Sequence, residues 1–481
     1  MKTDTETARS ATMTEAAGTA GHPILAAPVT DAQITALQAE LGRQGVHTLL
    51  AQFVDMNGTP KGKWVPLHQL VALVRDGAGF AGPSIVGTGL PRTGPRSEFY
   101  ARADLGTLRV LPWMPGVARV ACDGFVAGEP FSGCPRQVLR RAEARLAERG
   151  WRLKVGIEPE FFLLKRGPQG QWLPFDDHDR LDKPSYDLKS LPRQAGFLFA
   201  LRQALEAAGM HVEQTDHEDA HGQYEINFAH ALARTSADHL SLFKLAAHTL
   251  AEQQGAVFSM MPKPFANQPG SGLHFHVSLW GGDAAAPGGE HCVFAPDDGS
   301  RGLSPLARQF IAGVLAHSAA LTALAAPTVN SYKRLVVGES LSGTSWAPAY
   351  VAHGPNNRTT VVRTLNGRFE WRLPDASANP YLALAGLIEA GLDGIDRGLD
   401  PGPDCTEDLF ALPLAGLRER GIALLPQSLI EAVDALAADP VVQGALGPEL
   451  APQFDRLKRA EWTEYARHVS HWELERYGAW L

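Results

Sequence analysis

Cysteine is scarce in this sequence, and its spacing excludes two common ways of stabilising a protein. The chain has 481 residues but only four cysteines, Cys122, Cys134, Cys292 and Cys405, and no CxxC pair. Such spacing argues against a disulfide framework and against a zinc site built from thiolates. We therefore expect a protein of a reducing compartment, the cytoplasm.

Excess positive charge and long apolar segments are also missing. Lys and Arg total 44 against 52 Asp and Glu, so the net charge is −8 and no overall basic field favours nucleic acid. The most apolar long stretch, residues 311–327, is rich in alanine and contains His317, so we expect a buried helix rather than a membrane span. With 44% apolar and 20% charged residues, the composition is typical of a globular protein. We expect neither nucleic acid nor membrane as a partner.

The order of the sequence patterns predicts an α+β protein with two domains. Residues 1–28 are rich in Thr, Ala and Ser and lack the basic start and apolar block of a signal peptide, so we expect a disordered tail. A small β-rich domain is predicted over residues 29–128. Pro135 then opens a predicted helix to about Arg149, and strands alternate with helices from there to the C-terminus. We assign residues 129–481 to a larger second domain.

Two short motifs fit their usual functions poorly. Residues 217–221 spell HExxH, the string of zinc proteases, but that string works on a helix, and the residues that follow predict a loop running into a strand. Residues 77–82 spell GxGxxG, but Pro83 and further glycines stand where the helix of a dinucleotide site should begin. The P-loop string GxxxxGK[ST] does not occur in the sequence. A bound nucleotide would therefore need another kind of site.

Four predicted strands carry chemically reactive side chains on one face. Apolar and polar residues alternate in each of them, so the polar ones share a face. The polar positions are Glu158 and Glu160 in residues 154–164, Gln223, Glu225 and Asn227 in 223–228, His274, His276 and Ser278 in 273–279, and Arg368, Glu370 and Arg372 in 368–373. One such strand alone would be the solvated face of an antiparallel sheet. Four together indicate a site, because exposed strands usually carry Thr, Lys and mixed polar residues.

Glutamates gathered in one place repel one another unless cations neutralise them, so the pattern predicts a site with two or more metal ions. Ligands rich in carboxylates, with at most one imidazole per ion, favour Mg²⁺ or Mn²⁺, whereas zinc would recruit more His or Cys. Arginines at 334, 358, 363, 368 and 372 accompany the acids, although each taken alone could be a surface residue. Divalent cations beside arginines indicate phosphoryl transfer, in which both bear the charge of the transferring group.

These segments together resemble the glutamine synthetase superfamily, in its type I-like branch. The matching segments follow the order of the family: GIEPEFF (156–162), HE (217–218) with GQYE (222–225), GSGLHFH (270–276), NSYKR (330–334), NR (357–358), RFEWR (368–372), PD (374–375) and ANP (378–380). The resemblance implies a small β-grasp-like N-terminal domain and a larger catalytic domain with a curved antiparallel sheet flanked by helices. It also implies a homo-oligomer, a dodecamer of two hexameric rings with active sites between neighbouring subunits.

The resemblance implies a set of site residues as well. They are Glu160, Glu218 and Glu225 for a first metal; Glu158, His274 and Glu370 for a second; Arg334, Arg372 and Gly270 for the carboxylates of glutamate; and Ser278, Arg358, Arg363 and Arg368 for ATP. Of these, Arg334, Arg358 and Glu370 would act in catalysis. Alternation alone puts Arg358 and Arg363 on opposite faces of a strand, so a bulge or bend would be needed to bring both to ATP.

The implied reaction has two steps. The γ-carboxylate of glutamate attacks ATP to give an acyl phosphate, and an amine then displaces phosphate. Metals and arginines neutralise charge in the first step. The second step needs a free amine, so a base or a desolvating pocket must remove a proton.

The sequence departs from ammonia-using members of the family at two places. Those members carry an Asp in an N-terminal Phe-Asp-Gly-Ser-Ser string and a Glu just before Ala-Pro in a flap. Here Ala81, in Phe-Ala-Gly-Pro-Ser (80–84), and Trp346 stand at those positions. Without two anions the capture of ammonium weakens, and an indole beside a small Ala favours an amine that bears carbon. The sequence around Ala81, Ser84 and Trp346 resembles that of the branch of the family that joins glutamate to methylamine.

Several functions stay open on the sequence alone. Residue chemistry supports only an amine other than ammonia, and Glu339, in the longer flap, could replace the missing base. Within the same class, the chain could act on polyamines or ethanolamine, or on ammonia as a glutamine synthetase. From another class, it could be a catalytically silent ring-forming regulatory protein, although such a protein has no reason to keep mutually repelling carboxylates. The leading hypothesis is an ATP-dependent glutamate–amine ligase for a small alkylamine, with methylamine favoured.

Overall fold

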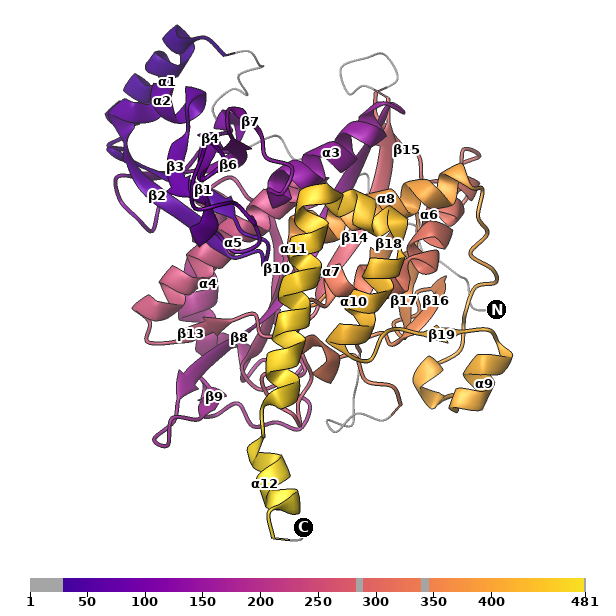
Figure 1. Cartoon of the computed structure of the whole chain (residues 1–481). Helices are drawn as coiled ribbons and strands as arrows, with labels where there is room; N and C mark the ends of the chain where they lie inside the picture. Colours follow the sequence, from indigo (N-terminus) through magenta and orange to yellow (C-terminus); the bar gives the residue numbers. More distant parts are fainter. Residues whose placement is uncertain (1–28, 283–288, 339–345, 480–481) are drawn as a thin grey trace, which may run out of the picture.

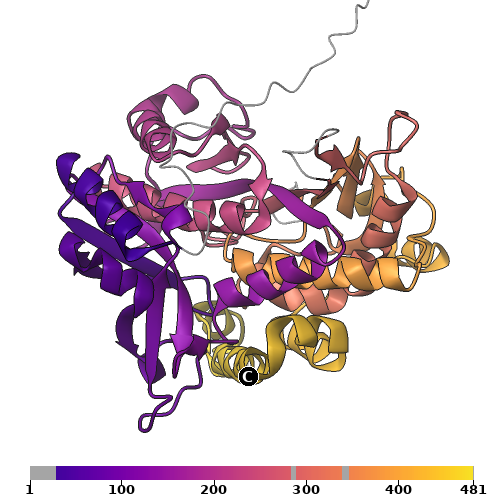
Figure 2. The same cartoon turned by 90° about the horizontal axis from the view of Figure 1, so that it is seen from above.

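The computed structural model describes residues 29–282, 289–338 and 346–479, which form two β-sheets with covering helices (Figure 1). The tail predicted over residues 1–28 and Glu339 lie outside the described residues. Seen from above, the N-terminal sheet with its helices occupies one side of the molecule and the larger sheet the other (Figure 2). The α+β class predicted from the sequence is confirmed.

The first sheet has seven strands in the order β2-β1-β6-β4-β3, with β5 and β7 paired to β6. The strands are β1 (Thr48–Val54), β2 (Pro60–Pro66), β3 (Ala78–Ala81), β4 (Glu98–Ala103), β5 (Arg109–Val110), β6 (Val117–Val126) and β7 (Glu129–Pro130). Helices α1 (Asp31–Arg43) and α2 (Leu70–Arg75) pack against it through a core that includes Ile34, Leu49 and Leu70. Because β7 ends at Pro130, the sheet extends slightly past residue 128, and the division into domains stays a prediction.

The second sheet has twelve strands, and the long strand β8 lies near its centre. The main order is β10-β11-β8-β14-β18-β17-β16-β19, with β9, β12 and β13 paired to β8 and β15 to β14. The bounds are β8 (Trp151–Arg166), β9 (Trp172–Pro174), β10 (Val212–His217), β11 (Gln223–Phe228), β12 (Ala231–Leu232), β13 (Val257–Ser259), β14 (Leu273–Gly281), β15 (His291–Cys292), β16 (Tyr350–Pro355), β17 (Thr360–Leu365), β18 (Arg368–Trp371) and β19 (Ala423–Leu424). The pairs are antiparallel as predicted, except that β16 and β17 run parallel.

Ten further α-helices belong to the part of the chain that the structure describes after the first sheet. They are α3 (Pro135–Ala147), α4 (Ala195–Ala207), α5 (Ala233–Gln253), α6 (Pro305–Ala316), α7 (Ser318–Ala325), α8 (Pro380–Asp396), α9 (Leu414–Glu419), α10 (Leu429–Ala438), α11 (Pro440–Arg467) and α12 (His471–Tyr477). The single helix predicted over 311–327 is two helices that meet at His317, whose ring lies 2.6 Å from Asp439 Oδ2 and 3.0 Å from Asp393 Oδ2. Among the described helices, none is long and apolar enough to cross a membrane.

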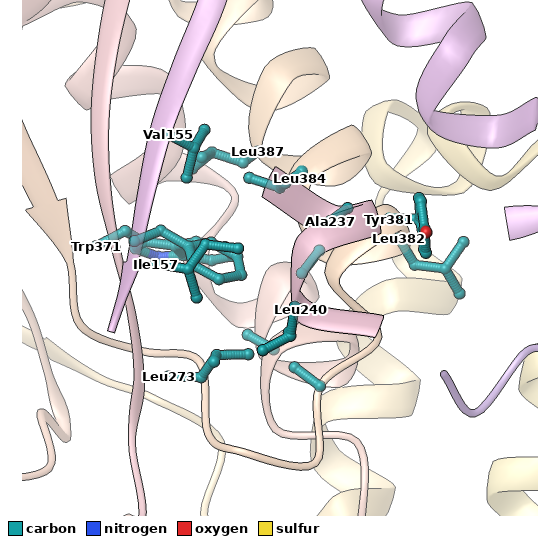
Figure 3. Close-up of a cluster of buried hydrophobic side chains, with 14 of the residues drawn as sticks. Val155, Ile157, Ala237, Leu240, Leu273, Trp371, Tyr381, Leu382, Leu384 and Leu387 are labelled. Atoms are coloured by element: carbon teal, nitrogen blue, oxygen red, sulfur yellow. The ribbon is translucent and has the colours of Figure 1, made fainter. Parts of the chain in front are cut away.

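One face of the large sheet is buried under helices. Ile157 of β8 and Trp371 of β18 point from the strands toward Leu240 of α5 and Leu384 and Leu387 of α8 (Figure 3). Each of these five side chains is at most 2% exposed. Because neighbouring residues of a strand point to opposite faces, this packing fixes which residues of the same strands face the other way.

Candidate active site

Strands β11, β8, β14 and β18 lie next to one another, and their register brings the predicted polar positions together. Three cross-strand pairs result: Glu225 opposite Glu160, His274 opposite Glu158, and His276 opposite Glu370. Directly opposed residues point to the same face with Cβ atoms about 4.5–5.5 Å apart. Alternation within each strand was predictable, and the register joins four separate strands into one polar surface.

The side chains near this surface form three overlapping groups of possible metal ligands. In each group the ligand atoms lie within 4.8 Å of one another: Glu158, His276 and Glu370; Glu158, Glu225 and His274; and Asp216, Glu218 and Glu225. Glu160 is in none of these groups of described residues, and its Oε2 accepts hydrogen bonds from Gln223 Nε2 at 3.0 Å and Gly272 N at 2.8 Å. The predicted division of the ligands into two sets of three stays a prediction.

Three carboxyl groups at one end of this set would repel one another if all were ionised, and the pKa of each is raised. Burial raises the pKa of Glu225 to about 10, and the charges of Glu218 and Glu160 raise it further. Burial and Glu160 also raise the pKa of Glu218 well above its usual range. Burial and the same neighbour raise the pKa of Asp216 to about 6. Glu218 and Glu225 therefore hold protons at neutral pH unless a cation takes their place, whereas Asp216 is mostly ionised there.

Glu158 and Glu370 show the opposite behaviour. Burial disfavours the charge of Glu158, but hydrogen bonds with His274 and His276 outweigh it and hold its pKa below the usual range. His276 Nε2 lies 2.7 Å from Glu158 Oε1. Burial likewise disfavours the charge of Glu370, yet Arg372 and His274 lower its pKa to about 2. These two carboxylates are ionised by their protein neighbours alone.

The ligand set fits hard divalent cations. Carboxylate oxygens predominate, with one imidazole in each of two groups and none in the third. Mg²⁺ and Mn²⁺ prefer such ligands, whereas zinc sites recruit more nitrogen and sulfur. A cation among Asp216, Glu218 and Glu225 would remove the repulsion that raises their pKa values.

A cavity of about 670 Å³ opens over the polar surface. Eleven of the predicted site residues line it: Glu158, Glu160, Glu218, Glu225, Gly270, His274, Arg334, Trp346, Arg358, Arg363 and Arg372. Glu370 lies beside it and accepts a hydrogen bond from Arg363 Nη1 at 2.8 Å. A glycine is required at position 270, because a Cβ there would lie 2.3 Å from the carbonyl oxygen of Pro262.

Two of the cavity arginines lack a counter-ion among the described residues. Arg334 is 5% exposed, and its Nη1 donates to the carbonyl oxygen of Leu373 at 3.3 Å without an ion pair. The guanidinium of Arg358 has neither a hydrogen bond nor an ion pair with the residues that the structure describes. Arg363 and Arg372, by contrast, both pair with Glu370. Arg334 is buried, and a buried cation without an ion pair favours an anionic ligand, whereas Arg358 is exposed to solvent at the cavity.

A turn explains how Arg358 and Arg363 reach the same cavity although strand alternation would separate them. Arg358 lies between β16 and β17, in a turn that follows Asn356, whose φ is +50°. Arg363 lies within β17, and its Nε donates to Asn356 Oδ1 at 2.9 Å. The bend that the sequence analysis required is therefore present, and both arginines line the cavity.

Besides Glu370, four predicted site residues do not line this cavity. Ser278 lies farther along β14, where its Oγ accepts a hydrogen bond from Trp280 Nε1 at 2.9 Å. Arg368, at the start of β18, has its Nε 3.4 Å from His276 Nδ1. Ala81 and Ser84 are exposed residues of the N-terminal sheet region. Their predicted roles at the nucleotide and the amine stay predictions.

Sequence reasoning missed two possible metal ligands, His276 and Asp216. Both could have been found: His276 shares a strand face with His274, and Asp216 stands two residues before Glu218. The strand pairing places Asp216 opposite Glu225. Other cavity residues outside the prediction are Ser185, Tyr186, Gln214, Asp219, Gln223, Lys263, Pro269 and Ala347.

Comparisons with known proteins agree with one another. The family model for the glutamine synthetase catalytic domain matches residues 132–477. A glutamate–methylamine ligase of Methyloversatilis universalis is 47% identical over 443 residues, which cover 92% of this chain and 98% of that protein. A glutamine synthetase of Halobacterium salinarum is 40% identical over 450 residues, 91% of this chain and 95% of that one. A solved structure of a GmaS/ADP complex has a TM-score of 0.84 and 37% identity, covering 92% of this chain and 99% of the other.

Proposed function

Since the chain belongs to the glutamine synthetase family, we propose that it joins glutamate to a small alkylamine, methylamine by preference, while ATP is converted to ADP and phosphate. The enzyme is then an ATP-dependent carbon–nitrogen ligase that forms a γ-glutamyl amide through γ-glutamyl phosphate. The similarity to a glutamate–methylamine ligase supports the choice of amine. The need for ATP favours the cytoplasm.

One observation carries this proposal: carboxylates, imidazoles and arginines without counter-ions converge in a single cavity. Arg334 and Arg372, with the backbone at Gly270, would hold the carboxylates of glutamate. Arg358 and Arg363 would contact the phosphates of ATP, and Ser278 and Arg368 would lie by the nucleotide. Guanidinium groups suit both partners because they bind carboxylate and phosphate oxygens in pairs.

We propose that two or more Mg²⁺ or Mn²⁺ ions bind beside these arginines. Their proposed ligands are Glu158, Glu160, Glu218, Glu225, His274 and Glu370, with Asp216 and His276 as further candidates. When bound, such ions neutralise phosphate charge and orient the phosphates. The raised pKa values of Glu218 and Glu225 support this assignment, since mutual repulsion is what a cation would relieve.

In the first step, a γ-carboxylate oxygen of glutamate attacks the γ-phosphorus of ATP, and ADP leaves. Arg358, free of other partners, would bear charge on the transferring phosphoryl group. Arg334 would hold glutamate so that its reacting oxygen is oriented. In the second step, the nitrogen of the amine attacks the acyl carbon, and phosphate leaves.

The second step also releases a proton from the amine. Among the described cavity carboxylates, the pKa of Asp216 is raised to about 6, because burial and the charges of Glu160 and Glu158 disfavour its ionised form. A base works best when its pKa lies near the working pH. Asp216 is also a candidate metal ligand, and a bound cation would lower that pKa, so we keep Glu339, in the flap, as the candidate proton acceptor.

The choice of amine rests on Trp346 and Ala81. Trp346 lies at the cavity and is 48% exposed. Ala81 and Ser84 lie on the N-terminal sheet, outside the cavity of the same chain, so they would act only if a neighbouring subunit supplies them. This arrangement supports a homo-oligomer with active sites between subunits, and we propose the dodecamer of two hexameric rings.

Phosphate release from ATP tests the proposal. Purified protein is assayed with glutamate, Mg²⁺ or Mn²⁺, and one amine at a time: ammonium, methylamine, ethanolamine or putrescine. The value of kcat/KM is determined for each amine. We expect methylamine to exceed ammonium about tenfold, the factor of a hydrophobic contact with one methyl group. Equal or better turnover with ammonium would refute the amine assignment, and no amine-dependent release would favour the silent regulatory protein. Highest turnover with putrescine or ethanolamine would favour the polyamine or ethanolamine ligase.

A further inference from the structure

The HExxH string of the sequence begins at His217, the last residue of β10, and continues into the loop before β11; its two histidines tie that loop to a neighbouring segment. His217 Nε2 lies 2.7 Å from Asp179 Oδ2, and His221 Nε2 lies 2.8 Å from the carbonyl oxygen of Leu181. Asp179 Oδ2 also accepts a hydrogen bond from Gly222 N at 2.6 Å. Both ends of the loop are therefore anchored to residues 179–181.

Asp219, in the middle of this loop, connects two other parts of the cavity wall. Its Oδ1 accepts a hydrogen bond from the hydroxyl group of Ser185. Its Oδ2 accepts one from the indole Nε1 of Trp346 at 2.5 Å. Asp219, Ser185 and Trp346 all line the cavity. One carboxylate thus joins segments that are 34 and 127 residues away in the sequence.

These contacts place two aromatic side chains at the cavity. Tyr186 follows Ser185 directly, lines the cavity, and has a φ of +62°, an uncommon conformation for a residue other than glycine. Its backbone N donates to the carbonyl oxygen of His217 at 2.9 Å. Trp346 is held a second time, since its carbonyl oxygen accepts a hydrogen bond from Arg372 Nη2 at 3.1 Å. The indole is therefore fixed at both its ring nitrogen and its backbone.

We propose that Asp219 is a positioning residue that sets the preference for an alkylamine over ammonium by fixing Trp346 and the Ser185–Tyr186 segment. The inference rests on the proposed function. Aromatic faces beside carboxylates attract alkylammonium ions, and they do so best when the ring is held in one orientation. A half-exposed indole without its hydrogen bond would sample several orientations and contact the methyl group less often.

The variant Asp219→Asn tests this role, because it keeps the side-chain volume but leaves one oxygen to accept two hydrogen bonds. We expect the KM for methylamine to rise about tenfold, the factor of one lost hydrogen bond to a charged group. The KM values for ATP and glutamate should change less than about twofold, since neither ligand contacts Asp219 in this assignment. The ratio of kcat/KM for methylamine to that for ammonium should fall.

Trp346→Phe keeps an aromatic ring but removes the N–H donor, so it should shift the methylamine KM in the same direction. The double variant should show less than the sum of the two single effects, because both remove the same hydrogen bond. Asp177→Asn is the matched control: its carboxylate is 65% exposed, pairs with Lys165 and does not line the cavity. It should leave all KM values unchanged.

Three outcomes would overturn the inference. They are an unchanged methylamine KM in Asp219→Asn, an equal loss of kcat with both amines, and additive effects in the double variant. The wild-type protein separates this failure from failure of the proposed function. If wild-type protein releases phosphate with methylamine and the variants behave as the control does, only the role of Asp219 is refuted. If wild-type protein shows no amine-dependent release, the proposed function is refuted, and the inference with it.

Discussion

The two faces of the large sheet are made by the same strands and do opposite things for stability. On one face, Trp371, Phe275 and Ile157 are at most 2% exposed and pack under helices. On the other face, Glu370, His276 and Glu158 gather close enough to hold a metal ion. Burying a large apolar side chain stabilises the fold by about 1.5–3 kcal/mol, whereas crowding carboxylates destabilises it. The packing of the apolar face therefore offsets the destabilisation that the crowded carboxylates of the polar face cause.

This difference shows how one strand can serve structure and chemistry together. In β18, Glu370 and Trp371 are neighbours in sequence but point to opposite sides of the sheet. Because the side chain of Trp371 is packed in the core, the strand cannot rotate about its axis. The side chain of Glu370 is therefore held toward the other side of the sheet. Rigid strands position reactive groups more accurately than loops do.

Removing packing from the apolar face should have the largest effect on stability. Trp371→Ala should lower the free energy of unfolding by about 3–5 kcal/mol, because it leaves a cavity in a closely packed core. Its Nε1 has no hydrogen-bond partner among the described residues, so little polar stabilisation is lost with it. Chemical denaturation followed by circular dichroism measures the change. An effect below about 1 kcal/mol would contradict the assignment of this face to the core.

Removing a carboxylate from the polar face should lower the activity without lowering the stability of the fold. Glu218→Gln should lower kcat about 10²–10³-fold with every amine, the loss typical of one charge-stabilising group. Its free energy of unfolding should not fall, because Glu218 is repelled by Glu160 and Asp216 in the folded protein. Steady-state phosphate release and denaturation are measured on the same preparation. A loss of stability as large as that of Trp371→Ala would remove the distinction between the faces.

The pH dependence of the metal-free protein should sharpen the comparison further. Glu225 has a folded pKa of about 10, far above the unfolded value of about 4.3, so it carries a proton in the folded state at neutral pH. Its stabilising contribution is complete below the unfolded pKa and is lost as pH rises toward the folded pKa. The free energy of unfolding in chelator should therefore fall by up to about 1.4 kcal/mol per pH unit between pH 5 and 9.

Glu225→Gln serves as the comparison for this titration, since it cannot release the proton. Its stability in chelator should depend less steeply on pH than that of the wild type, and at pH 8 it should be the more stable protein. Addition of Mn²⁺ should stabilise the wild type more than the variant, because a bound ion stabilises the folded state in proportion to its affinity. Parallel pH curves for the two proteins would show that Glu225 does not titrate as described.

The sequence predicted which polar residues lie together more fully than it predicted the path of the chain. Five of the six expected metal ligands fall into groups with short mutual distances. The helix expected over 311–327 instead breaks at His317, since two aspartates from distant segments hold its ring, and no local pattern records them. The short strand β3, within the glycine-rich stretch after Gly77, was not predicted either, because only its pairing with β4 makes it a strand.

What the sequence determined by itself is the direction of each side chain within a strand. Glu158 and Glu160 had to share a face, opposite Ile157 and Phe161, because a period of two is a property of the local backbone. What only the tertiary structure decided is which strands pair and in what register. Those pairings put Asp216 opposite Glu225 and His276 opposite Glu370, and they depend on contacts between residues far apart in the chain.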